Sequence, residues 1–140
     1  MTLLSAVVSA QPYIQVNRAY SGSGVDKTLT LTVRNISNKT MYIRNQSVYC
    51  HECSCINYKY MSSSGSVLYE STTVMEEENL TYIQPQSSKS FTFKIGSAAR
   101  YPSNVNKNDI RTIQLRLGIR YIIPELNYSN FFSITDNEAF

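Results

Sequence analysis

The sequence predicts an all-β protein: an antiparallel β-sandwich of the immunoglobulin-like class, with a jelly roll as the alternative architecture. The first of three supporting observations is Thr112–Tyr121, where apolar and polar residues alternate over ten positions. A period of two belongs to a strand with one face on a core and the other toward water. The second observation is the same alternation in Leu29–Val33 and Phe91–Ile95. The third is that helical periodicity is nearly absent, while turn residues separate roughly seven to nine short apolar runs.

The first part of the chain is expected to form three strands. Tyr13–Ala19 opens the series, and the flexible Ser21–Gly24 follows it. Lys27–Arg34 is a core strand with threonines on its outer face. Asn35–Lys39 turns the chain, because Asn and Ser side chains hydrogen-bond to the local backbone. Met41–Tyr49 is then the next strand.

Three shorter strands are expected in the middle of the chain. Ile56–Met61 is expected to pair with the preceding strand, Met41–Tyr49, with the cysteines in the turn between them. The serine-rich turn Ser62–Gly65 then leads into Val67–Thr73. Leu80–Ile83 is a short, edge-like strand. It ends before Pro85, because proline has no amide hydrogen to donate to a neighbouring strand.

The last expected strands include the strongest one. Ser90–Ile95 is a second core strand, and the polar loop Ser97–Asn108 follows it. Ile110–Ile123 is the long alternating strand and stops at Pro124. Asn130–Thr135 then returns antiparallel beside it.

The length of 140 residues suits one domain with a single core. We expect this β-sandwich domain to cover residues 13–140, preceded by an apolar N-terminal segment, residues 1–12. Val8 and Ala10 have the spacing that precedes a signal-peptidase cleavage site, so the segment can be the remnant of an export signal. It can equally be a leading strand, or a donor strand that pairs with another subunit.

The amino-acid composition bears on where the protein is located and on which partners it can bind. Only 16% of the residues are charged, and serine, threonine, asparagine and 11 tyrosines supply most of the polarity. This predicts an extracellular or cell-surface protein, with a cytoplasmic protein as the alternative. A net charge of +3 from scattered basic residues argues against nucleic acid as a partner. No apolar run approaches the length of a membrane-spanning helix.

Several segments together resemble a loose family of immunoglobulin-like modules that includes cell-surface adhesion modules and small proteinase-inhibitor-like sandwiches. They are Leu29–Thr40, Ser64–Gly65, Ile83–Pro85 and Phe91–Phe93. In that family a strand ending in a V-x-N-x-S pattern precedes an apolar strand, and a later I-x-P leads into another core strand. The resemblance implies the sandwich fold and a binding role rather than catalysis. It transfers no functional residue.

One cysteine-rich turn is the local candidate for a covalent or metal site. Cys50, His51, Cys53 and Cys55 stand within six residues. Cys50 can form a disulfide with Cys53 or Cys55, provided the compartment is oxidising. The alternatives are a zinc site of three thiolates and one imidazole, and three reduced thiols that fill space. Apart from this zinc hypothesis we expect no cofactor.

The sequence predicts that the protein is not an enzyme, and we assign no catalytic residue. His51 is its only histidine, which limits acid–base catalysis near neutral pH. The carboxylates gather mainly in the run Glu76–Glu78, which gives no obvious pair of catalytic acids. Ser21–Gly24 lacks the lysine and helix of a phosphate-binding loop.

Surface sites are suggested by sequons and by aromatic residues. Five N-glycosylation sequons occur, and Asn35, Asn38, Asn79 and Asn127 are the expected accessible acceptors, with turn chemistry as the alternative explanation. The expected interface residues are Tyr58, Tyr60, Arg116 and Arg120. Tyrosine suits an interface because it combines apolar area with a hydrogen-bonding hydroxyl.

The functional prediction is a structural or interaction module of a cell-surface, secreted, filament or coat assembly. It would act by contacts of a sheet face or a strand edge with a protein partner, including copies of itself. Two alternatives stay open. One is an inhibitor or ligand-binding module that presents the loops Ser97–Asn108 and Glu125–Tyr128, and the other is a zinc-binding protein using Cys50–Cys55.

Overall fold

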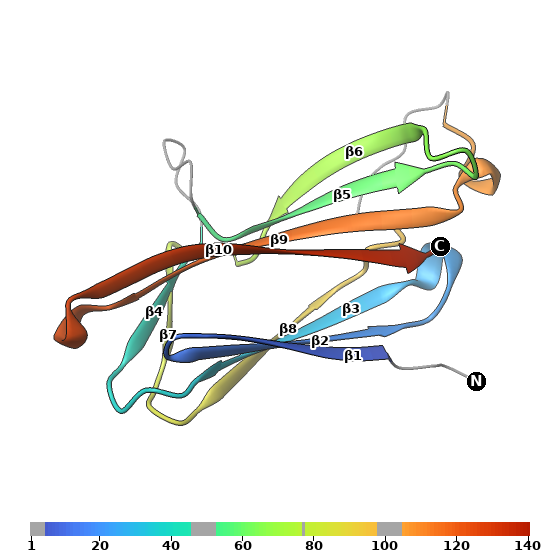
Figure 1. Cartoon of the computed structure of the whole chain (residues 1–140). Coiled ribbons are helices and arrows are strands. Elements are labelled where there is room, and N and C mark those ends of the chain that lie inside the picture. The colour runs from blue at the N-terminus through green and yellow to red at the C-terminus, as the bar shows by residue number, and fades with distance from the viewer. Residues whose placement is uncertain (1–4, 46–52, 77, 98–104) are drawn as a thin grey trace.

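Antiparallel strands and short 3-10 turns make up the part of the chain that the computed structural model describes, residues 5–45, 53–76, 78–97 and 105–140 (Figure 1). No α-helix occurs in these residues, and no helix there could cross a membrane. The strands are β1 (Ser5–Gln11), β2 (Ile14–Ser21), β3 (Thr28–Asn35), β4 (Met41–Arg44), β5 (Cys55–Met61), β6 (Val67–Val74), β7 (Leu80–Ile83), β8 (Ser88–Phe93), β9 (Thr112–Ile123) and β10 (Tyr128–Ala139). The 3-10 turns are η1 (Gly24–Asp26), η2 (Lys107–Asp109) and η3 (Pro124–Leu126).

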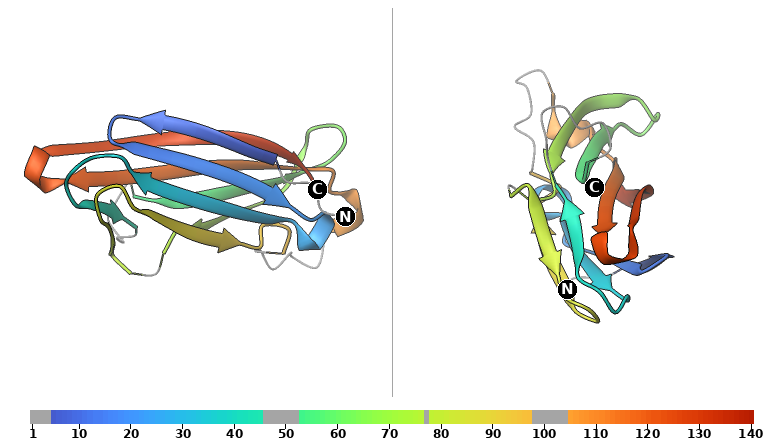
Figure 2. Two further views of the ribbon diagram at one scale, coloured as in Figure 1. Left: turned by 90° about the horizontal axis from the view of Figure 1, so that it is seen from below. Right: turned by 90° about the vertical axis from the view of Figure 1, so that its left-hand side faces the viewer.

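The strands form two antiparallel sheets. The first sheet has the order β1-β2-β3-β8. The second has the order β6-β5-β9-β4-β7, and β10 also pairs with β9. Seen from below, the first sheet lies in front of the second (Figure 2).

Strand β9 organises the second sheet because three strands pair with it. One side of β9 pairs with β10 along its whole length. The other side pairs first with β5 and then, near its end, with β4. Ser54 lies where the partner of β9 changes from β5 to β4. Its amide donates to the Arg44 carbonyl at 2.9 Å, and its Oγ accepts from the Arg120 amide at 3.0 Å.

The alternation seen in the sequence places one face of each core strand between the sheets. The buried apolar residues of β9 are Ile113, Leu115, Leu117, Ile119, Tyr121 and Ile123. From the first sheet, Leu29, Leu31 and Val33 of β3 belong to the same core cluster. Burying an aliphatic side chain of this size contributes about 1.5–3 kcal/mol, so this core is the main stabilising feature. The prediction of an all-β, antiparallel protein is therefore confirmed.

Most expected strands are present, but the expected pairing of Met41–Tyr49 with Ile56–Met61 is wrong: β4 pairs with β7 and β9, and β5 pairs with β6 and β9. Among the strands themselves, β10 differs most in length from its prediction. The sequence predicts a strand over Asn130–Thr135, whereas β10 runs from Tyr128 to Ala139. Asp136 and Glu138 interrupt the alternation of apolar residues, so the sequence carries no signal for the second half of the strand. They nonetheless lie on the inward side, where Asp136 pairs with Arg18 of β2 and Glu138 pairs with Lys27, which immediately precedes β3.

Of these two ion pairs, the one between Arg18 of β2 and Asp136 of β10 makes more hydrogen bonds and is nearly buried. Arg18, which is 4% exposed, donates through Nε to Asp136 Oδ2 at 2.7 Å and through Nη2 to Oδ1 at 3.0 Å. Its Nη1 donates to Ser9 Oγ at 2.7 Å, and the Tyr20 hydroxyl donates to the same carboxylate. Side chains from β1, β2 and β10 therefore meet in one polar network that links the two sheets.

The N-terminal segment contributes a strand to the first sheet. Residues 5–11 form β1, which pairs with β2 through a turn of two residues, Pro12 and Tyr13. Tyr13 has φ +70°, and its ring packs edge-on against Tyr128 with the centroids 5.0 Å apart. Residues 5–11 thus form a leading strand at the edge of the first sheet. An export-signal remnant and a donor strand for another subunit remain predictions.

Candidate binding surface

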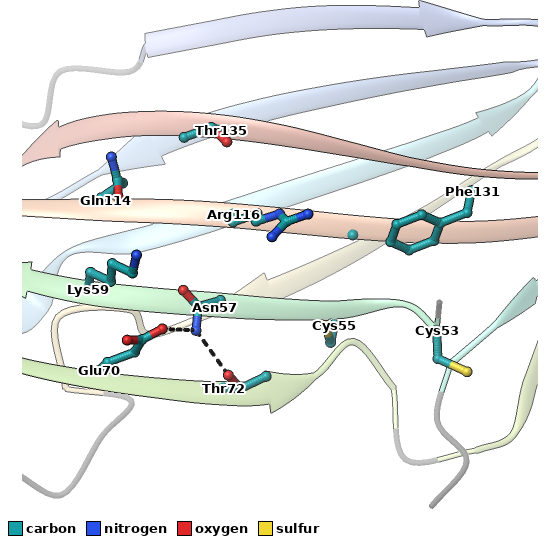
Figure 3. Close-up of a pocket in the computed structure, with 11 residues that line it drawn as sticks. Cys53, Cys55, Asn57, Lys59, Glu70, Thr72, Gln114, Arg116, Phe131 and Thr135 are labelled. Carbon is teal, nitrogen blue, oxygen red and sulfur yellow. Dashed lines mark hydrogen bonds between the residues drawn. The ribbon is translucent and has the colours of Figure 1, made fainter. Parts of the chain in front are cut away.

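A groove of about 570 Å³ lies on the outer face of the second sheet, across β6, β5, β9 and β10 (Figure 3). We call it the outer groove. It is lined by Cys53, Cys55, Asn57, Lys59, Glu70, Thr72, Gln114, Arg116, Gly118, Phe131 and Thr135. Apart from Cys53, which precedes β5, these residues occupy the strand positions that alternate with the core residues.

Strand register arranges the lining residues in rows that run across the sheet. In one row, Arg116 of β9 lies between Asn57 of β5 and Thr135 of β10. In the next row, Gln114 of β9 lies opposite Lys59, which in turn lies opposite Glu70 of β6. Neighbouring residues in such rows are close enough to act on one ligand together.

The outer groove carries two cationic side chains and one carboxylate, so the charge of its lining is net positive. Neither Arg116 nor Lys59 makes an ion pair or a side-chain hydrogen bond with any part of the chain that the structure describes. The one carboxylate in the lining, Glu70, instead accepts a hydrogen bond from Asn57 Nδ2 at 2.9 Å. The same Nδ2 lies 3.0 Å from Thr72 Oγ1. The groove is therefore electrostatically suited to a negatively charged group.

One end of the groove is apolar because a phenylalanine lies over a glycine. A Cβ atom at Gly118 would come within 3.0 Å of Phe131 Cζ and 3.2 Å of Cε2. The absence of a side chain at Gly118 thus lets the Phe131 ring lie close against β9. In Figure 3 the Arg116 side chain extends along β9 toward this ring. A glycine within an alternating strand is the sequence signal for such a close approach.

Cys55 contributes a neutral thiol to the groove. It is a free cysteine and is half-buried. Burial raises the pKa of the Cys55 thiol above its ordinary value, and the nearby Arg116 guanidinium lowers this pKa in part. Because the thiolate is the reactive form, Cys55 is poorly suited to act as a nucleophile near neutral pH.

Only part of the remaining cysteine cluster lies within the described residues. Cys50 and His51 lie outside the described residues, and Cys53 is buried at the edge of the groove. The described parts of the chain contain no group of three or more histidine, cysteine, aspartate or glutamate residues that could hold a metal ion. The zinc hypothesis involves residues 50 and 51, so it remains a prediction.

Two of the four expected interface residues face the core. Tyr58 is 1% exposed and Tyr60 is 0% exposed, and the Tyr60 hydroxyl donates to the Ile95 carbonyl at 2.5 Å. The prediction that they form a contact surface is corrected by this burial. They do share one face of β5, but the outer face of that strand carries Asn57 and Lys59 instead.

The two expected interface arginines lie on the outer side of β9. Arg116 is exposed and lines the groove. Arg120 is half-buried and lies opposite Phe131 in the β9–β10 register. The sequence analysis did not predict three further groove residues, Asn57, Gln114 and Phe131. A strand's own sequence does not show which residues of the neighbouring strands will lie beside it.

The four candidate glycosylation acceptors differ in exposure. Asn38, Asn79 and Asn127 are exposed. Asn35 is 0% exposed, and its Nδ2 donates to the carbonyl oxygens of Lys39 at 2.7 Å and Ile83 at 2.9 Å. The prediction of an accessible acceptor at Asn35 is therefore corrected, because its amide is fully used inside the protein.

Comparison with known proteins identifies no family. No family model matches the chain, and no curated protein matches it. The structure of the structural-genomics target SoR45 aligns with 100% of this chain and 84% of its own, at 10% identity and a TM-score of 0.48. The putative ApaA protein from Bordetella pertussis aligns with 99% of this chain and 94% of its own, at 9% identity and a TM-score of 0.49. Likeness at this level leaves fold class and function to be argued from the chain itself.

Proposed function

We propose that the chain is a non-enzymatic binding module with an immunoglobulin-like β-sandwich fold, and that it contacts its partner through the outer groove. The fold assignment is supported by two antiparallel sheets whose inward residues form one core cluster. The observation that carries the functional proposal is that Arg116 and Lys59, two cations outside any ion pair within the described chain, lie in one concave surface whose net charge is positive. Concave surfaces with a few converging polar groups are the usual places where ligands bind.

A binding role is favoured over catalysis by the chemistry of the lining residues. The thiol of Cys55 is kept in its protonated form by burial. The Glu70 carboxylate is hydrogen-bonded to Asn57, and the lining contains no imidazole. Within the described residues no base is hydrogen-bonded to the Cys55 thiol, so the groove does not hold the paired nucleophile and base that covalent catalysis needs.

An extracellular or cell-surface location goes with a proposed disulfide between Cys50 and Cys53. Cys55 is a free cysteine, which leaves these two as the remaining pair among the three cysteines of the chain. Intact mass under non-reducing conditions, with and without alkylation, tests this in protein from its native source. One alkylated thiol and a mass lower by two hydrogens is the expected result, whereas three alkylated thiols would contradict it.

The binding proposal is tested by comparing charge-reversed variants in an affinity capture from the native source. The groove variant combines Lys59→Glu with Arg116→Glu, and the matched control is Arg34→Glu on β3 of the first sheet. We expect partners captured by the wild-type protein and by the control to be lost with the groove variant. If the groove variant captures the same partners in the same amounts, the outer groove is not the contact surface.

A further inference from the structure

We propose that the outer groove binds an acidic sugar, whose carboxylate is held between Arg116 and Lys59. This inference rests on the proposed function, because it names the ligand class of the same groove. It is supported by the charges in the groove, their spacing, the neutral groups around them and the apolar wall at one end. Each of these features restricts the chemistry of the ligand.

The charges favour a carboxylate ligand. Arg116 and Lys59 form no ion pair and no side-chain hydrogen bond within the described chain. Glu70 lies opposite Lys59, but its carboxylate accepts a hydrogen bond from Asn57 instead. A guanidinium offers a planar, two-pronged set of donors that matches the geometry of a carboxylate. Lysine adds a compact second charge. A cationic or neutral ligand would leave the net positive charge of the lining uncompensated.

The spacing of the two cations suits one acidic group. Arg116 lies opposite Asn57 in the β5–β9 register, and Lys59 lies two residues further along β5. Diagonal neighbours of this kind are separated by about 7–8 Å, within reach of long side chains. Both side chains are long enough to bind a single carboxylate above the sheet, once the Arg116 side chain turns from Phe131 toward Lys59.

The neutral groups of the groove suit a ligand with several hydroxyls. Gln114 and Thr135 lie beside Arg116 on β9 and β10, and neither forms a side-chain hydrogen bond with any residue that the structure describes. An amide and a hydroxyl can each donate and accept, as sugar hydroxyls can. A volume of about 570 Å³ is also far larger than a single inorganic anion needs and lies in the range of small-molecule sites.

The apolar end of the groove suits the C–H face of a sugar ring. Phe131 is half-buried and packs over Gly118, so its position is fixed by the strand beneath it. Its ring lies close to Arg116, at the end of the groove where the sheet has no other large side chain in the lining. An acidic sugar would then place its carboxylate on the cations and its apolar face toward Phe131.

The test is a titration of the full, ¹⁵N-labelled chain followed by amide chemical shifts. The probe is a glucuronate-containing tetrasaccharide, and the matched control is its uncharged methyl ester. We expect the acid to change the chemical shifts of amides in β5, β9 and β10. The ester should bind with an affinity at least about tenfold lower than that of the acid. Arg116→Ala and Lys59→Ala should each weaken binding of the acid about tenfold, while Arg34→Ala should not change it.

Several results would overturn the inference. These are the absence of shifts with the acid, equal affinity for acid and ester, or equal shifts from sodium acetate, which would indicate a site for any anion. Tighter binding of a glutamate-rich peptide than of the sugar would also overturn it, in favour of a protein ligand. In that case the Lys59→Glu/Arg116→Glu variant would still lose the partners captured by the wild-type protein. The sugar assignment would then fail while the proposed function stands.

Discussion

The side chain of Asn35 closes the connection between β3 and β4. Its Oδ1 accepts from the amide of Ser37 at 2.9 Å and from its hydroxyl at 2.7 Å, while Nδ2 donates to two carbonyls. Substitution by alanine would leave several buried polar groups without partners. We therefore expect Asn35→Ala to lower the free energy of unfolding by about 2–3 kcal/mol, measured by urea denaturation.

The control for this prediction is Asn38→Ala, in the same connection. Asn38 is exposed, so its substitution should change stability by less than about 0.5 kcal/mol. Equal effects of the two substitutions would contradict a structural role for Asn35. Expression in a glycosylating cell gives a second check, because Asn35 should carry no glycan.

Two neighbouring tyrosines of β5 are expected to respond in opposite directions to loss of the hydroxyl. Within the described chain the buried Tyr58 hydroxyl has no hydrogen-bond partner, whereas the Tyr60 hydroxyl donates to Ile95. Tyr58→Phe should raise the free energy of unfolding by about 1 kcal/mol, and Tyr60→Phe should lower it by about 1 kcal/mol. Chemical denaturation of both variants under the same conditions tests this, and a loss of stability in Tyr58→Phe would contradict it.

At the scale of elements, the Arg18–Asp136 pair fastens β10 to the first sheet. The two side chains are only 4% and 13% exposed, so removing one would leave a nearly buried, unpaired charge. We expect Arg18→Met to lower the free energy of unfolding by about 3 kcal/mol or more. Combining it with Asp136→Leu should restore part of that loss, and a double-mutant cycle measures the coupling.

A more exposed ion pair provides the comparison. Lys89 and Glu76 approach to 3.3 Å, but their side chains are 42% and 31% exposed. Lys89→Ala should therefore change stability by less than about 1 kcal/mol. If it costs as much as Arg18→Met, burial is not what distinguishes the two pairs.

The elements differ in how far the sequence could predict them. Strands such as β3 and β9 have uninterrupted alternation, so their inward residues could be named directly. The second half of β10 could not be predicted, because Asp136 and Glu138 become acceptable inside only when Arg18 and Lys27 face them. The outer groove was missed for the same reason: Arg116 and Lys59 are brought together by register between strands far apart in sequence.

At the scale of the whole molecule, buried tyrosines make stability sensitive to alkaline pH. Burial raises the pKa of Tyr20, Tyr58 and Tyr121 above that of an exposed phenol. In the unfolded chain tyrosine ionises near pH 10. Below about pH 10 both states keep these protons, and above it only the folded state does. The free energy of unfolding should therefore fall as pH rises above about 10.

Urea denaturation at several pH values between 7 and 11 tests this prediction. Tyr58→Phe removes one of the buried phenols, so the decline of stability should become shallower by up to about 1.4 kcal/mol per pH unit. Tyr82→Phe, at a 60% exposed position, serves as the control and should keep the wild-type slope. Stability that does not change from pH 9 to pH 11 would contradict the prediction.

The central position of β9 has a consequence for synthesis on the ribosome. Strands β1, β2 and β3 pair in sequence order and can assemble as soon as about residue 35 has emerged. Strands β4 and β5, in contrast, emerge long before β9, their shared partner. At about 5–20 residues per second, several seconds pass before residues 112–123 follow them. During this interval the unpaired edges of the second sheet are exposed, and the nascent chain is most open to chaperones and to misfolding.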